Sequence, residues 1–194
     1  LQPLATEHPK NFLVHIHLAT AFFLSNNPEF REKAALQLKQ GLDHWPKQME
    51  DVDPAMRRFL EQAKLETEIE LERFRRIETY FKRFIRHRVR VDLLAKKGKQ
   101  VEDTVDPIFI DEDAKGDAKP APVKFLTEDG ASAVGRIAKA EKAKLPKDAV
   151  EIVEQLLIWM PHDQRLLWLL GEVVNASVMD YAEGDDRNDM IRSA

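Results

Sequence analysis

The sequence predicts a mainly α-helical protein, for three reasons. Apolar residues recur at three- and four-residue intervals through most of the chain, the pattern of helices that bury one face. Of the 194 residues, 43% are apolar and only seven are Gly, so the chain can form a core. One spacing also occurs twice, in Ala34, Leu38, Gly41 and Pro46 and again in Ala149, Val153, Leu156 and Pro161.

The first predicted pair of helices covers Pro9 to Pro46. Pro9 suits the first turn of a helix that includes Asn11–Leu24, and Asn26-Asn27-Pro28 then ends that helix and starts another. The second helix, Glu29–His44, is amphipathic. Small Ala34 and Gly41 lie on its apolar face, so we expect the two helices to approach closely there.

A much longer helical pattern begins at Asp53-Pro54 and continues to about Ala95. Its apolar seam is interrupted at Thr67, Glu70 and Arg88. We interpret it as one long helix, or two with a bend, that ends between Arg88 and Lys97 and packs on the first pair. A dimerising helix is the alternative.

Acidic residues and prolines dominate the segment 98–130, which predicts an excursion from the helical part. Ile108-Phe109-Ile110 and Val123-Lys124-Phe125-Leu126 are short β-prone runs, so a small hairpin that lies on the helices is possible. The sequence thus divides into 1–97, 98–130 and 131–194.

The last segment returns to helical periodicity. Apolar and small residues predict a helix that begins at Ala131 and breaks at Leu145-Pro146, and then a helix over Asp148–Trp159. Asp163 is a suitable cap for a further helix, Gln164–Ala176. We expect small Ala149 and Gly171 to permit close packing of these helices, as Ala34 and Gly41 do in the first pair. We expect the chain to stop inside a repeat array.

The repeated spacing, together with Leu18-Ala19-x-x-Phe22 and Leu167-x-x-Leu170-Gly171-x-x-Val174, resembles tetratricopeptide-repeat (TPR) proteins. The resemblance implies antiparallel helix pairs with one long central helix and a small loop or β-hairpin excursion. The order of segments is also similar to uncharacterised TPR proteins of planctomycete-type bacteria, which implies export if a signal peptide has been removed.

The resemblance also implies a partner-binding surface, because the first helix of each TPR unit lines the inner curve of the solenoid. The residues on that surface are Ser132, Arg136, Lys139, Arg165, Trp168, Glu172 and Asn175. The TPR clamp for a terminal carboxylate is absent, since Ser132 and Arg136 occupy its places. The corresponding face of the first unit is largely apolar, so we expect the long helix to cover it. Its residues are Leu13, Ile16, Thr20, Phe23 and Leu24.

The preferred function is therefore a non-catalytic scaffold for protein or peptide partners. The alternative is a binder of nucleic acid or another anionic surface through the basic helix Lys82–Lys99. Nucleic acid is the less favoured partner, because the chain has 30 basic against 34 acidic residues and the following acidic stretch could neutralise the helix. A cryptic enzyme that uses carboxylates around Asp180–Asp189 is a third interpretation.

No catalytic, cofactor-binding or metal-binding residue is predicted. The chain has no Cys, which excludes thiolate chemistry. Asp111–Gly116 begins like a calcium loop, but its closing glutamate would fall on Pro122. His15 and His17 point to different helix faces and should serve packing. No apolar run is long enough to span a membrane.

Overall fold

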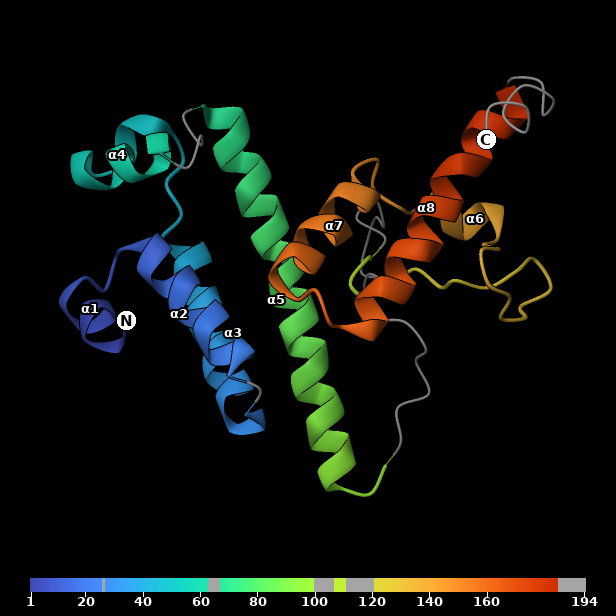
Figure 1. The fold of residues 1–194 in the computed structure, drawn as a ribbon, viewed down its shortest axis with the longest axis horizontal. Helices are drawn as coiled ribbons and strands as arrows, with labels where there is room; N and C mark the ends of the chain where they lie inside the picture. Colours follow the sequence, from blue (N-terminus) through green and yellow to red (C-terminus); the bar gives the residue numbers. More distant parts are fainter. Residues whose placement is uncertain (26, 63–66, 100–106, 111–120, 185–194) are drawn as a thin grey trace. The chain divides into compact units, whose positions relative to one another are not determined.

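The computed structural model describes residues 1–25, 27–62, 67–99, 107–110 and 121–184 (Figure 1). It divides into two compact units, Leu1–Val101 and Glu102–Ala194. Within the described ranges the regular secondary-structure elements are helices, which confirms the mainly α-helical fold class. The acidic run Asp111–Gly116, considered above as a calcium loop, lies outside the described ranges, and so do residues 185–189 of the acidic stretch Asp180–Asp189. The division of the chain at 98–130 stays a prediction.

Unit 1 begins with a short helix α1 (Gln2–Glu7), followed by the helices α2 (Phe12–Leu24) and α3 (Pro28–Asp43). Asn11 caps α2 by accepting a hydrogen bond from the Val14 N–H at 3.1 Å, and Asn27 caps α3 through the Glu29 N–H at 3.0 Å. The predicted bounds of both helices are confirmed within about one residue. Pro9, predicted in the first turn of α2, instead precedes that helix.

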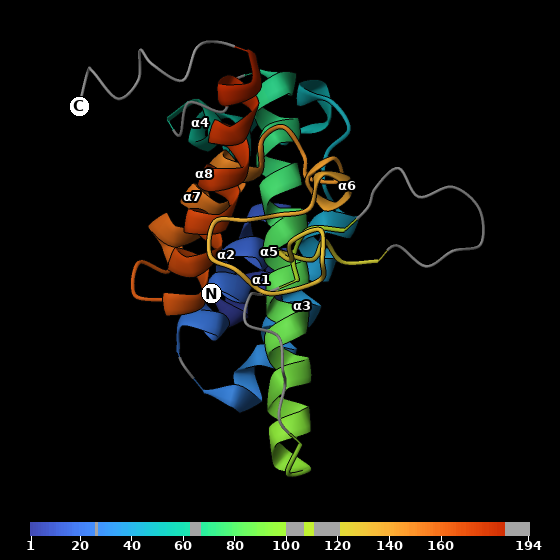
Figure 2. The ribbon, with the colours of Figure 1, turned by 90° about the vertical axis from the view of Figure 1, so that its right-hand side faces the viewer.

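α2 and α3 pack side by side (Figures 1 and 2), with their small residues at the contact. Ala19, Ala34 and Leu38 have no exposed surface. A Cβ placed on Gly41 would lie 2.9 Å from Ile16 Cγ1 and 3.1 Å from the Phe12 carbonyl oxygen. The prediction that Ala34 and Gly41 permit a close approach is therefore confirmed.

His15, on the buried side of α2, is held by polar contacts. Its Nε2 donates to the Pro9 carbonyl oxygen at 2.9 Å, and its Nδ1 lies 2.7 Å from Oε1 of Gln37 on α3. The ring is 4% exposed. His15 thus fixes the chain before α2 against the helix pair, which confirms its predicted packing role.

The long predicted helix is two helices, α4 (Pro54–Gln62) and α5 (Glu68–Lys96), and a 3-10 turn, η1 (Met49–Asp51), precedes them. α5 begins anew because Thr67 and Glu70 form a capping box: the Glu70 N–H donates to Thr67 Oγ1 at 3.2 Å and the Thr67 N–H to Glu70 Oε2 at 3.0 Å. The two residues interpreted as breaks in an apolar seam are therefore a helix start. α5 ends at Lys96, within the predicted interval.

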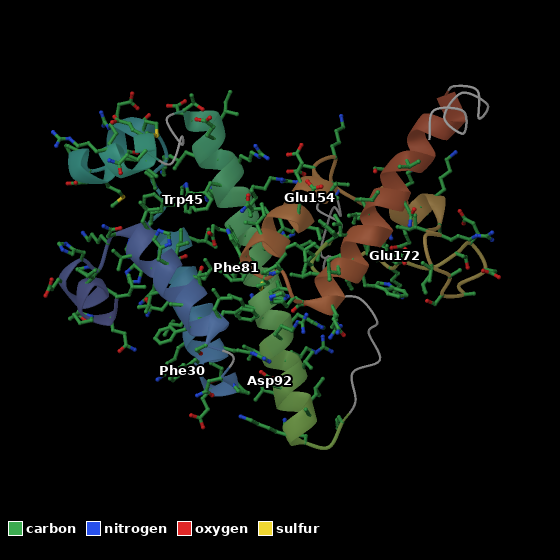
Figure 3. The ribbon with its side chains drawn as sticks, in the orientation of Figure 1. Phe30, Trp45, Phe81, Asp92, Glu154 and Glu172 are labelled. Carbon is green, nitrogen blue, oxygen red and sulfur yellow. The ribbon has the colours of Figure 1, made fainter. Side chains whose placement is uncertain are left out.

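Aromatic side chains pack α5 against the first helix pair (Figure 3). The Phe23 ring lies 5.7 Å from Phe81 and 5.4 Å from Phe84. Trp45 lies 4.7 Å from Phe12 and 5.4 Å from Phe74. These ring separations are those of favourable edge and tilted contacts.

The expectation that the apolar face of α2 is covered is confirmed only in part. Leu13 and Ile16 are buried and Phe23 contacts α5, but Leu24 is 53% exposed. Ile16 is covered by α3 at Gly41, so the long helix α5 does not provide the whole cover.

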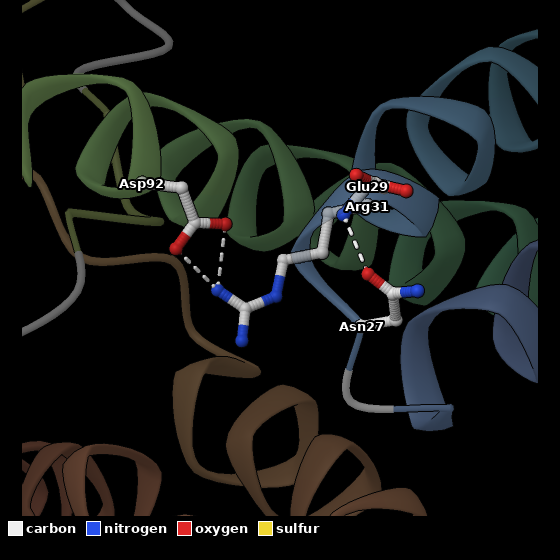
Figure 4. A network of polar contacts seen from close by, with 4 residues as sticks. All are labelled: Asn27, Glu29, Arg31 and Asp92. Atoms are coloured by element: carbon white, nitrogen blue, oxygen red, sulfur yellow. Dashed lines mark hydrogen bonds and ion pairs between the residues drawn. The ribbon is translucent and has the colours of Figure 1, made fainter. Parts of the chain in front are cut away.

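An ion pair between Arg31 on α3 and Asp92 on α5 joins the two helices (Figure 4). Arg31 Nη1 lies 2.7 Å from Asp92 Oδ1 and 2.8 Å from Oδ2, and both side chains are about one-fifth exposed. The Arg31 guanidinium also lies 5.9 Å from the centre of the Phe23 ring. Partial burial reduces the solvent screening that weakens fully exposed pairs.

Unit 2 contains α6 (Lys139–Lys142), α7 (Ala149–Trp159) and α8 (Gln164–Gly184), and α7 packs against α8. The bounds predicted for α7 are confirmed within about one residue, and so is the start predicted for α8. The predicted end of α8 at Ala176 is wrong, because the helix continues to Gly184. Of the predicted hairpin, the described residues form an antiparallel bridge between Ile110 and Pro122, with the Val123 N–H donating to the Phe109 carbonyl at 2.9 Å.

The helix predicted from Ala131 to the break at Leu145-Pro146 is confirmed only at α6, and over 131–138 the prediction is wrong. Gly130 and Gly135 have φ of +80° and +69°, which a right-handed helix excludes. The Ala138 N–H instead donates to the Leu126 carbonyl at 2.6 Å, so the segment forms a loop that returns to its own start. The TPR resemblance implies a helix directly before α7, and over 131–138 the structure has a loop there instead.

Gly41→Ala should destabilise unit 1 by about 1–3 kcal/mol, because the new methyl group must displace Ile16 or the backbone at Phe12. That cost exceeds the roughly 1 kcal/mol gain in helix propensity. Gly171→Ala in α8 is the matched control: no atom lies within 4 Å of the place that its methyl group would take, so propensity alone should stabilise unit 2 by about 0.5–1 kcal/mol. Hydrogen exchange of α2 and α8 amides measures the two effects separately, and equal shifts would contradict the close approach.

Glu78 gives unit 1 a pH-dependent stability. It is 1% exposed on α5, and its Oε2 has no hydrogen-bond partner among the described residues. Burial raises the pKa of Glu78 from 4.5 to about 8. The folded chain therefore keeps a proton that the unfolded chain releases above pH 4.5, so the contribution of Glu78 to stability is fully present below that pH and is lost as pH rises toward 8.

Between pH 5 and 8 the slope should approach about −1.4 kcal/mol per pH unit, and Glu78→Gln should remove it. Denaturant midpoints at unit pH steps measure the slope. Glu72→Gln, at an exposed position of the same helix, serves as the control. Parallel profiles for Glu78→Gln and the unaltered chain would show that Glu78 is ionised in the folded state.

Candidate partner-binding surface on α8

The start of α8 is fixed by Asp163. Its Oδ1 accepts hydrogen bonds from the N–H groups of Arg165 and Leu166, both at 3.1 Å. The inward face of α8 is then fully packed. It comprises Leu166, Leu169, Val173 and Ala176, each at most 2% exposed. These contacts define which residues of α8 remain on the outside.

The outward face of α8 is apolar and exposed. Leu167 is 50% exposed, Trp168 48%, Val174 36% and Val178 46%, and Gly171 lies among them at helical spacing. Arg165 and Glu172 are the only charged residues from Gln164 to Val178, and neither lies in this row. We call Leu167, Trp168, Gly171, Val174, Asn175 and Val178 the α8 face.

Glu172 serves the interior of unit 2 (Figure 3). It is 5% exposed, and its carboxylate accepts the Gly135 N–H at 3.1 Å to Oε2 and 3.3 Å to Oε1. Gly135 must be glycine here, because its φ is +69° and a Cβ would lie 2.8 Å from Asn175 Nδ2. Glu172 therefore anchors the loop 126–138 and cannot line an open groove, which corrects its predicted place.

Gly171 requires a further correction. We expected it to permit close packing inside the repeat, as Gly41 does, yet no atom lies within 4 Å of a Cβ built on it. The glycine is exposed in the middle of the α8 face. Another chain could therefore approach the α8 backbone closely at this point.

The other predicted partner-binding residues are spread over two kinds of structure. Trp168 and Asn175 lie on the α8 face, while Arg165 is half-buried at the start of the helix. Ser132 and Arg136 are exposed on the loop 126–138, and Lys139 begins the short α6. The inner-curve arrangement of these residues is therefore not formed, because the part of the predicted helix that should carry Ser132 and Arg136 is a loop. Whether any of them binds a partner stays a prediction.

Leu167, Val174 and Val178 were not among the predicted site residues. Their signal is present in the sequence, since a 15-residue stretch with two charges is unusual in a chain that is 33% charged. The helical pattern alone could not show which apolar face is buried.

A hollow of about 750 Å³ lies in unit 1 beside the start of α2, lined in part by Pro9, Leu13, Val14, His17 and Met56. Desolvation lowers the pKa of His17. No hydroxyl or thiol side chain is among its described lining. In the described part of the chain, no three His, Cys, Asp or Glu side chains converge as metal ligands.

No protein family, curated protein or solved structure compared with this chain matches it. The resemblance to TPR proteins therefore stays a prediction. Among the described residues, no helix combines the length and the apolar character needed to cross a membrane.

Glu172→Ala should release the loop 126–138 and destabilise unit 2 by about 1–3 kcal/mol, because the Gly135 N–H loses a charged acceptor. Hydrogen exchange in this loop should increase first. Glu154→Ala, at an exposed position of α7, is the control and should change stability by less than about 0.5 kcal/mol. An unaltered loop in Glu172→Ala would contradict its anchoring role.

Proposed function

We propose that this protein is a non-catalytic helical scaffold that binds protein partners, and that the α8 face receives an apolar helix of the partner. The observation that carries the proposal is an exposed row of large apolar side chains with no charged residue in it. Isolated exposed apolar residues are ordinary, but a contiguous row on one helix is typical of an interaction surface.

The side chains of the α8 face fit the chemistry of such an interface. Trp168 is a residue type that often contributes most of the binding energy in protein complexes. Leu167, Val174 and Val178 supply apolar area on the same face. Gly171 leaves space between them, so a partner helix can approach nearer than the usual 8–10 Å between axes.

Rigidity also favours this surface. α8 is held by its cap at Asp163, by α7 and by the loop anchored at Glu172. A surface on a fixed helix loses little conformational entropy when a partner binds. The bacterial scaffold implied by the TPR resemblance agrees with this interpretation, and the oligomeric state enters as an outcome of the test.

The test selects amphipathic helices from a displayed peptide library on the purified chain and then measures their affinity for variants. Trp168→Ala and Val174→Asp should each weaken binding at least tenfold, since the first removes an anchor and the second places a charge in an apolar contact. Ile69→Asp, which alters an aliphatic residue that is 82% exposed on α5, should leave the affinity within about twofold.

Sedimentation of the same variants identifies a second copy as the partner if Val174→Asp converts a dimer to a monomer. Selected helices that bind Val174→Asp and Trp168→Ala as well as the unaltered chain would refute the α8 face as the binding surface.

A further inference from the structure

A second surface, of different chemistry, follows the outward side of α5. Positions 75, 79, 82, 86, 90, 93 and 97 are separated by three or four residues and therefore share one face of the helix. All of them are basic except Thr79 and Leu93. We call Arg75, Lys82, Arg86, Arg90 and Lys97 the α5 ridge.

The α5 ridge is accessible and carries a strong local charge. Arg75, Arg86, Arg90 and Lys97 are exposed, and Lys82 is half-exposed. Over the stretch from Thr79 to Lys99, Asp92 is the only acid. It is already bound to Arg31 on α3. The local excess of positive charge is therefore not offset within the helix, although the whole chain has a formal charge of −4.

Carboxylates of unit 1 neutralise only part of the ridge. Glu72 contacts Arg75 at 3.4 Å, at one end. No described carboxylate forms an ion pair with Arg86, Arg90 or Lys97. The pKa of Lys82 is lowered, first by desolvation and then by Arg86 and Lys39, while Asp43 acts in the opposite direction. Like charges spaced three or four residues apart on one helix face repel one another, as the effect of Arg86 on Lys82 illustrates, and an anion placed along them would relieve that repulsion.

The ridge lacks the apolar centre of a typical protein interface. The cores of such interfaces are depleted in charged residues and enriched in aromatic ones. Leu93 is the single large apolar side chain in this row, and it is 43% exposed. A membrane surface is disfavoured for the same reason, because an interfacial helix needs a broad exposed apolar face.

The burial of the aromatic rings of α5 indicates whether the ridge suits a single-stranded or a double-stranded nucleic acid. Proteins that bind single strands stack bases on exposed aromatic rings. Phe81 and Phe84 are fully buried in the core, and Tyr80 is 1% exposed. Phe74 is partly exposed, but its ring packs against Trp45 at 5.4 Å. A cationic row without a stacking surface suits the regular phosphates of a duplex, whose contacts position a protein but carry no sequence information.

We propose that the α5 ridge binds the phosphate backbone of a nucleic-acid duplex without reading its sequence. From Arg75 to Lys97 the ridge is about 33 Å long at 1.5 Å per residue, close to one turn of duplex DNA at about 34 Å. Arg and Lys side chains along a straight, rigid helix of this length can contact the phosphate backbones of both strands where they flank a groove.

The test measures fluorescence anisotropy of a labelled 24-base-pair DNA duplex with the full chain from 25 to 200 mM salt. If all ridge cations contact phosphates, the logarithm of the association constant should fall with the logarithm of salt with a slope of about −4.5. Two duplexes of unrelated sequence should bind within about threefold. Arg86→Glu/Arg90→Glu should weaken binding at 50 mM salt at least 30-fold and reduce the slope by about 2.

The control is Lys10→Glu/Lys47→Glu, which makes the same change in net charge at exposed positions of unit 1 outside the ridge. It should bind within about twofold of the unaltered chain, and circular dichroism of both variants checks their folding. Equal losses in the two double variants would show general electrostatics and overturn the proposal. It would also be overturned by no duplex binding at 25 mM salt, or by polyglutamate or anionic vesicles binding more tightly than the duplex.

Discussion

The organisation of unit 1 depends on how closely α2 approaches α3 at Gly41. A side chain there would meet both Ile16 and a backbone oxygen, so glycine fixes the distance between the two helices. Trp45 follows Gly41 by about one helical turn and lies between Phe12 and Phe74. The close approach at Gly41 therefore helps to place the ring that seats α5, and the buried face of α5 determines which of its residues remain outside. The basic ridge is a consequence of that packing.

In unit 2, a buried carboxylate, that of Glu172, separates the inward face of α8 from its exposed face. Glu172 is directed to the Gly135 N–H, which satisfies a buried carboxylate and fixes a loop. A buried charge without such a partner would cost several kcal/mol. Glu172 therefore serves the interior and Asp163 the helix start, so these two acidic side chains of the described part of α8 are engaged locally. The outward face is left with apolar and amide groups only.

The sequence predicts helices well where pattern and end signals agree, and less well where a special backbone conformation decides. α2, α3 and α7 combine amphipathic spacing with capping or proline signals, so their bounds could be predicted. Thr67 and Glu70 were interpreted as interruptions of one helix, although together they form a capping box. The segment 131–138 has helical spacing, but the positive φ of Gly135 depends on its contact with Glu172, 37 positions later. Such a long-range contact leaves no periodic signal.

Long-range contacts also limit how much of the candidate surface on α8 could be predicted from the sequence. Trp168 and Asn175 could be named because the TPR resemblance assigns a face to that helix, whereas Glu172 was misplaced because its partner is a loop. Gly41 and Gly171 look equivalent in the sequence, because each is a single glycine inside a predicted helix. One is enclosed and the other open. Only the packing of neighbouring helices distinguishes a glycine that joins two elements of the fold from one that is accessible to a partner.

The two surfaces would respond to salt in opposite senses, which follows from their composition. Binding at the α8 face would depend on removing apolar area from water, and strongly hydrated salts strengthen that effect. Binding at the α5 ridge would depend on releasing counterions from phosphates, and added salt weakens it steeply. A protein with both surfaces can therefore hold a protein partner under conditions that release a nucleic acid. The physical basis is that basic residues share one face of α5, whereas the exposed α8 face contains no charged residue.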